Sequence, residues 1–214
     1  CFHGTGDECV FLQQRARLTK NPPTNERLVS YIMRVITGTA RGRKLQAPDG
    51  MDTRPTTDLV KEAVFSVIHF IVPCANVLDL FAGSGQMGIE ALSRGANKAV
   101  FVDSSRKALD VIKQNVQNTG FAKQAKVLSG DAESFLKNAV EKYDIIFLDP
   151  PYNQGYPDKL LPILGKPLSE NGVVLYEHDK KEELPEETED LVLKKRYRYG
   201  RTMVSSYVRK SDEN

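Results

Sequence analysis

Short apolar runs alternate with amphipathic segments through most of the chain after residue 75. The runs are nearly continuously apolar: NVLDLF, KAVFVD, AKVLSG, YDIIFLD and GVVLYEH. Between the first four, apolar positions recur at helical spacing, in MGIEALSR, SSRKALDVIKQNVQNT and AESFLKNAV. Gly95 and Gly120 close the first two of these helical segments. This alternation predicts an α/β fold, with a mostly parallel sheet covered by helices on both faces.

The two ends of this pattern differ from its middle. LVLKKRYRYG and TMVSSYVRK, joined by Tyr199-Gly200-Arg201, predict an antiparallel hairpin at the end of the chain. Residues 33–48 read MRVITGTARGRKLQAP, and two β-prone runs around a glycine turn predict an N-terminal β-hairpin. Residues 58–71 carry valine and isoleucine at helical spacing after Thr57, a candidate N-cap, and predict an amphipathic helix.

Residues 1–32 do not continue the pattern, since they lack a sustained apolar period and contain a Pro-Pro pair. They also lack the long apolar core of a signal peptide. Because the sequence opens with Cys1 and Met33 precedes the first patterned segment, we expect residues 1–32 to be an N-terminal extension outside the core. We therefore expect one domain at residues 33–210, with residues 211–214 as a tail.

Composition narrows the class of protein. With 40% hydrophobic and 27% charged residues, the 214-residue chain has the balance of a globular domain. Its apolar runs fall short of the ~20 residues that a membrane helix needs, so we expect no membrane association. Three cysteines without metal-like spacing predict a reducing, cytoplasmic setting and no metal site. Pro73-Cys74 precedes the first core strand without an acidic partner, and we expect Cys74 to be a buried thiol.

Charge is unevenly distributed although the net charge is only +2. Lys194 to Lys210 holds seven basic residues and no acid, whereas Glu177 to Asp190 holds eight acids and two lysines. Clustered basic residues can contact nucleic-acid phosphates, and interleaved tyrosines can stack on bases. They can equally be the solvated edge of a sheet. The candidate RNA-binding residues are Arg34, Arg41, Arg43 and Lys44 in the first hairpin, and Lys195, Arg198 and Arg201 in the last.

A glycine-rich turn joins the first core strand to its helix. Gly83, Gly85 and Gly88 satisfy G-x-G-x-x-G, which lets a ligand approach the backbone at a helix N-terminus. Asp79, four residues earlier, suits an ammonium group and would repel a pyrophosphate. Asp103 and Asp131 follow the next two strands, where carboxylates can accept from ribose hydroxyls and an adenine amine. Each acid alone could be a helix N-cap, but together they indicate S-adenosylmethionine.

The strand YDIIFL leads into Asp149-Pro150-Pro151-Tyr152, a sequence suited to holding a flat group that carries an NH2. Asp149 and the Pro150 carbonyl can accept the two amine protons, the prolines fix the backbone, and Tyr152 offers a stacking face. Such contacts favour a pyramidal nitrogen whose lone pair is directed at a sulfonium methyl, so orientation and electrostatics would carry most of the catalysis. The alternative is an ordinary proline turn.

With these motifs the chain resembles the class I methyltransferases, and more narrowly the RsmD family of 16S rRNA guanine-N2 methyltransferases. The resemblance covers Met33 to about Arg209. The narrower part rests on MRVITGTARGRKL and TRPTTDLVKEAVFSVI, followed by VLDLFAGSGQMGIEALSRGA, FVDSS, GDA, LDPPY and Tyr199-Gly200-Arg201-Thr202. It implies a Rossmann-like sheet of seven strands with an antiparallel last strand, S-adenosylmethionine as donor, and 16S rRNA or the assembled small ribosomal subunit as partner.

The resemblance also implies roles for individual residues. Asp149, Pro150 and Tyr152 would hold the flipped base, and Arg54 and Thr56 would lie near the cofactor or the target. The residues expected to bind the cofactor are Asp79, Gly83, Gly85, Asp103, Asp131, Ala132 and Thr56. We expect a monomer.

Three other functions fit parts of the sequence. The acceptor amine could be adenine N6, cytosine N4 or a glutamine side chain, because DPPY is compatible with each. The glycine turn could serve a nicotinamide-dependent oxidoreductase. The chain could also be a non-catalytic RNA-binding module, although an intact DPPY argues against it.

Overall fold

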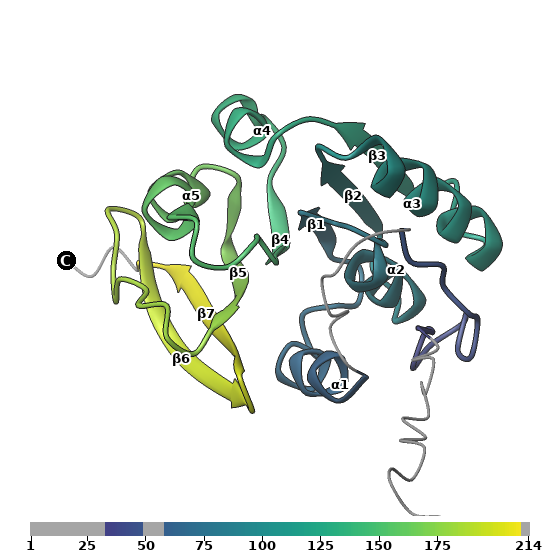
Figure 1. Ribbon diagram of the computed structural model, residues 1–214, viewed down its shortest axis with the longest axis horizontal. Helices are drawn as coiled ribbons and strands as arrows, with labels where there is room; N and C mark the ends of the chain where they lie inside the picture. The colour runs from purple at the N-terminus through teal and green to yellow at the C-terminus, as the bar shows by residue number, and fades with distance from the viewer. Residues whose placement is uncertain (1–32, 49–57, 211–214) are drawn as a thin grey trace, which may run out of the picture. The chain divides into compact units, whose positions relative to one another are not determined.

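The computed structural model describes residues 33–48 and 58–210, which belong to one compact unit, Ile32–Asn214. These residues form helices and strands that alternate along the chain (Figure 1). The helices are α1 (Asp58–Val67), α2 (Gln86–Ser93), α3 (Arg106–Thr119), α4 (Ala132–Asn138) and α5 (Tyr156–Leu164). The strands are β1 (Asn76–Leu80), β2 (Lys98–Asp103), β3 (Ala125–Ser129), β4 (Tyr143–Leu148), β5 (Leu168–Asp179), β6 (Leu191–Tyr199) and β7 (Thr202–Arg209).

Several predictions fall on other residues. The predicted extension at residues 1–32, the tail at 211–214, the N-cap Thr57 and the candidates Arg54 and Thr56 lie outside the described residues.

The seven strands form one sheet in the order β3-β2-β1-β4-β5-β7-β6. Strands β1 to β5 pair in parallel, whereas β7 is antiparallel to both β5 and β6. The predicted mostly parallel seven-stranded sheet with an antiparallel last strand is therefore confirmed. The strand order reverses between β1 and β4, which is the point where open α/β sheets bind ligands beyond the carboxyl ends of their strands.

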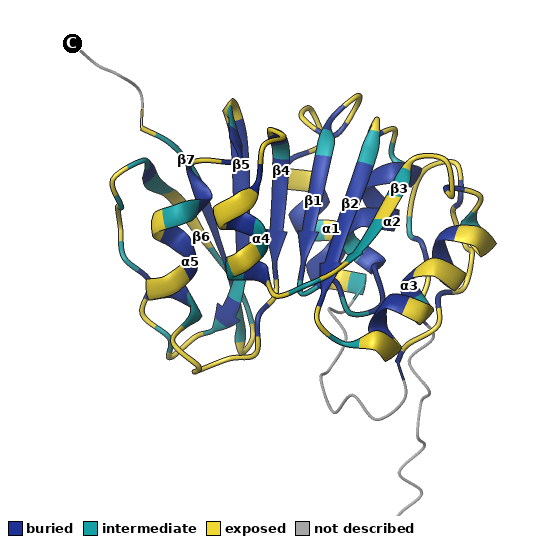
Figure 2. Cartoon of the chain, turned by 90° about the horizontal axis from the view of Figure 1, so that it is seen from above, coloured by how far each residue is buried: buried dark blue, intermediate teal, exposed yellow. Residues whose placement is uncertain are grey.

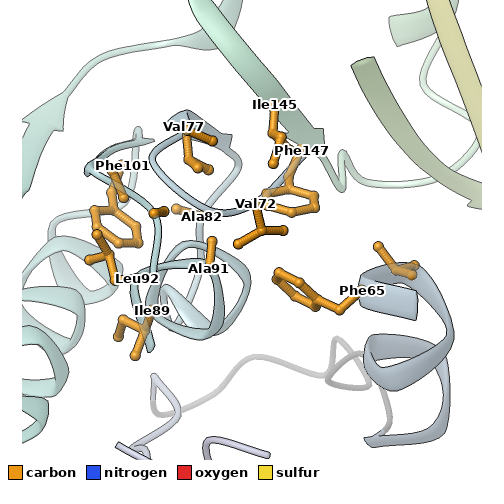
Figure 3. Close-up of a cluster of buried hydrophobic side chains, with 14 of the residues drawn as sticks. Phe65, Val72, Val77, Ala82, Ile89, Ala91, Leu92, Phe101, Ile145 and Phe147 are labelled. Atoms are coloured by element: carbon orange, nitrogen blue, oxygen red, sulfur yellow. The ribbon is translucent and has the colours of Figure 1, made fainter. Parts of the chain in front are cut away.

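Alternating side chains of the central strands supply two hydrophobic clusters, one on each face of the sheet. Val77, Ile145 and Phe147 face the cluster shared with α1, α2 and α3. Their neighbours Leu78 and Ile146 face the cluster shared with α4 and α5. Figure 3 shows the first cluster, where Phe65 of α1 lies beside Phe147, with ring centroids 5.6 Å apart. The strands are buried between helices whose outer faces are exposed (Figure 2), which confirms helices on both faces.

Helix α5 was not predicted, because its sequence YPDKLLPIL contains two prolines. Pro157 lies in the first turn, where its missing N–H removes no helical bond. Pro162 lies inside the helix and removes one. Leu160, Leu161 and Leu164 are fully buried in the second cluster, and this burial outweighs the lost hydrogen bond.

The prediction of a buried Cys74 is wrong, because the thiol is exposed. Cys74 occupies a turn between α1 and β1 with a positive φ of 64°. Its neighbours Val72 and Ala75 are buried, so the turn directs those two side chains inward and the thiol outward.

The two predicted hairpins form to different extents. Strands β6 and β7 pair through to Tyr199 and Thr202, with Gly200 at φ 67° in the turn. In residues 33–48, pairing is limited to one antiparallel bridge, Arg34 with Lys44, supported by the backbone bonds from Leu45 N to Met33 O and from Val35 N to Arg43 O. We refer to residues 33–46 as the N-terminal arm.

Buried polar side chains fasten the N-terminal arm to the helices. The Glu90 carboxylate accepts hydrogen bonds from Ile36 N at 2.7 Å and Thr37 N at 3.0 Å, and Lys61 Nζ donates to Arg34 O at 2.6 Å. Lys61 and Glu90 are both fully buried and lie 3.8 Å apart. Burial lowers the pKa of Lys61, against the stabilising charge of Glu90.

Asn115 of α3 fastens the other end of the N-terminal arm. Its Oδ1 accepts from Gln46 N at 2.8 Å, and its Nδ2 donates to Gln46 O and to Ser84 O, both at 2.9 Å. Ser84 belongs to the glycine turn after β1, and its Oγ lies 3.1 Å from Met33 Sδ. The N-terminal arm and the glycine turn are thus joined through one fully buried side chain.

Candidate functional site

Acidic side chains gather at the carboxyl ends of the parallel strands. Asp79 lies in β1, Asp103 ends β2, and Asp149 directly follows β4. Glu177 lies on β5, one residue beyond Tyr176, which pairs with Leu148. Because parallel strands end at the same edge of a sheet, these carboxylates come from distant parts of the sequence to one place. That place spans the reversal in strand order between β1 and β4.

The glycine turn between β1 and α2 is shaped by tight backbone geometry. Phe81, Gly83 and Gly85 have positive φ values of 57°, 55° and 75°. A Cβ on Gly88 would lie 2.3 Å from the Phe101 ring, so this glycine is required for packing rather than for ligand approach. Gly83 has open space beside it, with only the Phe81 carbonyl within 4 Å at 3.9 Å. The turn can therefore bring its backbone close to a ligand at Gly83.

Asp79 is buried in a site with excess negative charge. It is 4% exposed, and its Oδ2 accepts from Gly88 N at 2.9 Å. Burial, together with the nearby charge of Asp103, raises the pKa of Asp79 to about 7, although the hydrogen bond from Gly88 acts to lower it. A cation beside Asp79 would relieve this cost, which agrees with the predicted ammonium contact.

Asp103 and Asp131 both accept hydrogen bonds from backbone N–H groups, and such a structural role is the alternative that the sequence predicts for each acid. Asp103 accepts from Gly83 N through Oδ2 and from Ser105 N through Oδ1, each at 2.8 Å, and so braces the glycine turn. Asp131 is the N-cap of α4 and accepts from Glu133 N and Ser134 N through Oδ1. Hydrogen bonding at this cap, led by Ser134, lowers the pKa of Asp131.

The N-cap alternative is thus confirmed for Asp131. Its contact with adenine, the contact of Asp103 with ribose, and the cofactor role of the buried Ala132 stay predictions. Each of the two carboxylates retains acceptor capacity, because an ionised carboxylate has about four lone-pair positions.

The Asp149-Pro150-Pro151-Tyr152 segment leaves β4 at the same edge. Asp149 is an exposed residue. Desolvation of its carboxylate by the surrounding protein raises its pKa well above the usual range, and the negative charges of Glu177 and Asp79 add to the effect. Pro150 is buried, and the Tyr152 hydroxyl donates to Glu177 Oε1 at 3.1 Å. The segment is therefore a shaped part of the acidic edge and not a surface turn.

Two residues at this edge were missed from the sequence. Glu177 follows the apolar run GVVLY in the way that Asp149 follows YDIIFL, so the signal was present but lay at the start of an acid-rich stretch. Phe81 was read as part of a strand, yet it turns with a positive φ and packs edge-on against Tyr156 of α5 at 5.0 Å. This aromatic pair joins the glycine turn to the segment after Tyr152.

The structure brings only part of the predicted RNA-binding set to this edge. Arg201 lies in the β6–β7 turn, where its carbonyl accepts from Lys180 N at 3.0 Å, just beyond the end of β5. Arg198, near the end of β6, is exposed, and its Nε donates to Gly200 O in the turn at 3.4 Å.

The interleaved tyrosines of β6 have a packing role. Tyr197 and Tyr199 are half-buried and pack against the first hydrophobic cluster. Lys195 and Arg198 are exposed, and the Lys195 Nζ lies 5.1 Å from the centroid of the Tyr197 ring. A bulge between Leu193 and Lys195 makes residues 194–196 exposed in succession. Stacking of bases on these tyrosines stays a prediction, as does phosphate binding by the basic residues at this sheet edge.

The tip of the N-terminal arm lies at the far end of α2. Thr39 N donates to Ser93 O at 2.8 Å and Ala40 N to Ser93 Oγ at 3.0 Å, whereas α2 begins at the glycine turn. Eight residues of helix span about 12 Å. Arg41 and Arg43 are therefore separated from the acidic edge, while Arg34 pairs with Asp58 at 3.3 Å. Lys44 is exposed opposite Arg34.

The described residues contain neither a group of metal-ligating side chains nor a helix long and apolar enough to cross a membrane.

Known proteins share this arrangement. A protein-family model described as conserved hypothetical protein 95 matches residues 33–208. The Bacillus subtilis protein YlbH, named as a candidate rRNA methyltransferase, is 44% identical over 180 residues, which cover 82% of this chain and 98% of YlbH. Ribosomal RNA small subunit methyltransferase D of Escherichia coli is 39% identical over 132 residues, which cover 62% of this chain and 66% of that protein.

Among solved structures, the Escherichia coli protein yhhF superposes with a TM-score of 0.74 at 31% identity. The match covers 85% of this chain and 99% of that chain, so the sheet and its helices are shared along nearly the whole length of the solved protein.

Proposed function

The chain belongs to the family described as conserved hypothetical protein 95, the RsmD family of rRNA methyltransferases, and we propose that it methylates the exocyclic N2 amine of a guanine in 16S rRNA. The methyl donor is S-adenosylmethionine, and the product left behind is S-adenosylhomocysteine. The fold is the Rossmann-like fold of class I methyltransferases. The partner is 16S rRNA, free or in the small ribosomal subunit, and the expected location is the cytoplasm.

The observation that carries this proposal is the gathering of Asp79, Asp103, Asp149 and Glu177 at one edge of the sheet. Burial and the charge of Asp103 raise the pKa of Asp79, and burial and the charges of Glu177 and Asp79 raise the pKa of Asp149. Such a site favours a ligand with positive charge and disfavours the pyrophosphate of a nicotinamide dinucleotide. S-adenosylmethionine carries an ammonium and a sulfonium, and therefore fits the charge of this edge together with the open backbone at Gly83.

The chain's own residues have distinct parts in the reaction. When bound, S-adenosylmethionine supplies an electrophilic methyl group on its sulfonium. Asp79 would hold the ammonium, Asp103 the ribose, Asp131 with Ala132 the adenine, and Gly83 and Gly85 the shape of the turn. These contacts set the position of the methyl group relative to Asp149, which matters because an in-line displacement depends on orientation.

Asp149 and the Pro150 carbonyl would accept the two protons of the guanine amine, while the Tyr152 ring packs against the base. The new N–CH3 bond forms as the S–CH3 bond breaks, and the nitrogen then releases one proton. Asp149 is suited to take that proton, because its raised pKa makes it a better base than an ordinary aspartate.

The test is transfer of labelled methyl from S-adenosylmethionine to unmethylated 16S rRNA, both free and in assembled small subunits. Nucleosides from the product are separated, and the Asp149→Ala variant is run in parallel. We expect label in N2-methylguanine with the wild-type protein and none with the variant. Label in N6-methyladenine, N4-methylcytosine or methylated glutamine would overturn the choice of acceptor. Absence of label on every acceptor, with S-adenosylhomocysteine still bound, would overturn the enzymatic role.

A further inference from the structure

We infer that Glu177 is a specificity-determining residue, whose carboxylate accepts the ring N1–H of the target guanine while Asp149 and Pro150 accept from its amine. The inference rests on the proposed function and deepens it. It supplies a physical reason why the site takes guanine, which the DPPY segment alone does not provide.

Glu177 and Asp149 occupy matching positions on neighbouring strands. Leu148 of β4 pairs with Tyr176 of β5 in parallel register, and each acid is the next residue along its strand. Neighbouring strands lie about 4.8 Å apart, so two side chains in this register can reach one edge of the same base. Glu177 is also the charged group with the largest effect on Asp149.

The position of the Glu177 carboxylate is set by the same segment that would stack on the base. Tyr152 donates its hydroxyl proton to Glu177 Oε1 at 3.1 Å, so the ring and the carboxylate are held as a unit. The Glu177 side chain is half-buried. An ionised carboxylate has about four lone-pair positions, and the Tyr152 hydroxyl takes only one of them. Glu177 therefore stands beside the amine-binding position with its orientation already restricted.

The chemistry of the bases then separates guanine from the alternatives. In guanine the ring nitrogen next to the amine carries a proton, so the edge presents an unbroken row of donors to two carboxylates. In adenine and cytosine the ring nitrogen next to the amine is an acceptor, and its lone pair would face the Glu177 oxygens. When the wrong base leaves a polar group of the site unpaired or repels it, the site discriminates more strongly than one that selects a base by shape alone.

The experiment compares guanine with 2-aminopurine at the acceptor position of 16S rRNA assembled into small subunits. 2-Aminopurine keeps the amine but carries an unprotonated N1. For the wild-type protein, kcat/KM should be far higher for guanine. In the Glu177→Gln variant, we expect kcat/KM for guanine to fall by ~10- to 100-fold, as for loss of a hydrogen bond to a charged group. The preference over 2-aminopurine should shrink, because the glutamine NH2 can donate to the unprotonated N1.

Binding supplies a second readout that does not depend on turnover. Inosine carries the N1 proton but lacks the amine, so RNA with inosine at this position should compete with substrate for the wild-type protein better than RNA with 2-aminopurine. This difference should disappear in Glu177→Gln. Binding of S-adenosylhomocysteine and the melting temperature should stay at wild-type values, which separates loss of specificity from loss of structure.

The matched control is Glu170→Gln, an exposed glutamate at the opposite end of β5, which should change neither ratio. If Glu177→Gln does not fold, Glu177→Asp makes the same test, since it withdraws the carboxylate by one methylene. A variant that folds and keeps the full preference for guanine overturns the inference while leaving the proposed function intact. Failure of the wild-type protein to form N2-methylguanine would instead overturn the proposed function.

Discussion

The donor half of the site, at the ends of β1, β2 and β3, and the acceptor half, at the ends of β4 and β5, are held in different ways. In the donor half the carboxylates accept from backbone N–H groups: Asp79 from Gly88, Asp103 from Gly83 and Ser105. In the acceptor half the Glu177 carboxylate accepts from another side chain, the hydroxyl of Tyr152.

The difference teaches where folding and catalysis are coupled. In the donor half, the carboxylates of Asp79 and Asp103 hold the glycine turn in shape through backbone hydrogen bonds, and the same carboxylates would bind the ligand. In the acceptor half, Asp149 is open to solvent and its charge is opposed by its neighbours, so it contributes to chemistry more than to folding. Changes in the donor half should therefore affect stability and cofactor binding together, and changes in the acceptor half should affect catalysis and base recognition with little effect on stability.

The largest effect is expected for Asp149→Asn, which keeps the shape of the side chain and removes its charge. We expect kcat to fall by ~10²- to 10⁴-fold, the usual range for loss of a general base. The unfolding free energy should not decrease, because a repelled carboxylate is removed. Single-turnover methyl transfer and urea unfolding measure the two quantities. A variant that is both inactive and markedly unstable would break the distinction between the halves.

Asp79→Asn should have opposite effects on stability and binding. The pKa of Asp79 rises from 3.8 to about 7, so the folded protein holds this proton more tightly than the unfolded chain. Stability is therefore lost as pH rises from ~4 to ~7, at about 1.4 kcal/mol per pKa unit. The variant should be more stable than wild type by about 2–4 kcal/mol at pH 8, and by little at pH 4.

Urea unfolding at the two pH values tests this expectation, and calorimetry with S-adenosylhomocysteine should show weakened binding by the same variant. Equal stability of the variant and the wild-type protein at pH 8 would mean that the Asp79 charge is already compensated without a ligand.

Gly88→Ala tests the packing of the donor half. The added Cβ would lie 2.3 Å from the Phe101 ring, and relieving such a clash in a packed core costs about 1–3 kcal/mol. Gly130→Ala is the matched control, because a Cβ there meets nothing within 4 Å. Thermal unfolding of both variants measures the difference. A Gly88→Ala protein as stable as the control would show that the turn can shift without cost.

The smallest effect is expected from the basic residues beside the acceptor half. Replacing Arg198 and Arg201 together by alanine should weaken RNA binding moderately and reduce the slope of log K against log salt by about 2, one for each phosphate contact. Arg41→Ala, at the tip of the N-terminal arm, should change binding less. Filter binding over a salt series distinguishes the two. Equal losses would indicate that RNA also follows α2 to the far end of the sheet.

Much of the fold was predictable because apolar period and glycine positions are local signals. The strand ends at Asp79, Asp103 and Asp149 followed from such runs, as did the turn at Gly200. Helix α5 was hidden because burial of leucines overrode the local effect of Pro162. Glu177 was hidden because only pairing of β5 with β4 brings it beside Asp149.

The roles of the β6 tyrosines were hidden for a third reason. Side chains of a strand point alternately to its two faces, but the sequence of β6 does not say which face meets the core. The bulge at Lys194 also shifts this alternation within the strand. Likewise, the exposed Cys74 depends on a left-handed turn that residue type alone does not predict.

The Asn115 contacts give the N-terminal arm a thermodynamic meaning. One side chain holds Gln46 and Ser84 together, so an RNA that restrains the N-terminal arm also restrains the glycine turn. Thermodynamic linkage is reciprocal: if bound RNA raises the affinity for S-adenosylmethionine by some factor, bound S-adenosylmethionine must raise the affinity for RNA by the same factor. Asn115 is in this sense a place where the affinity for RNA and the affinity for the methyl donor would be coupled.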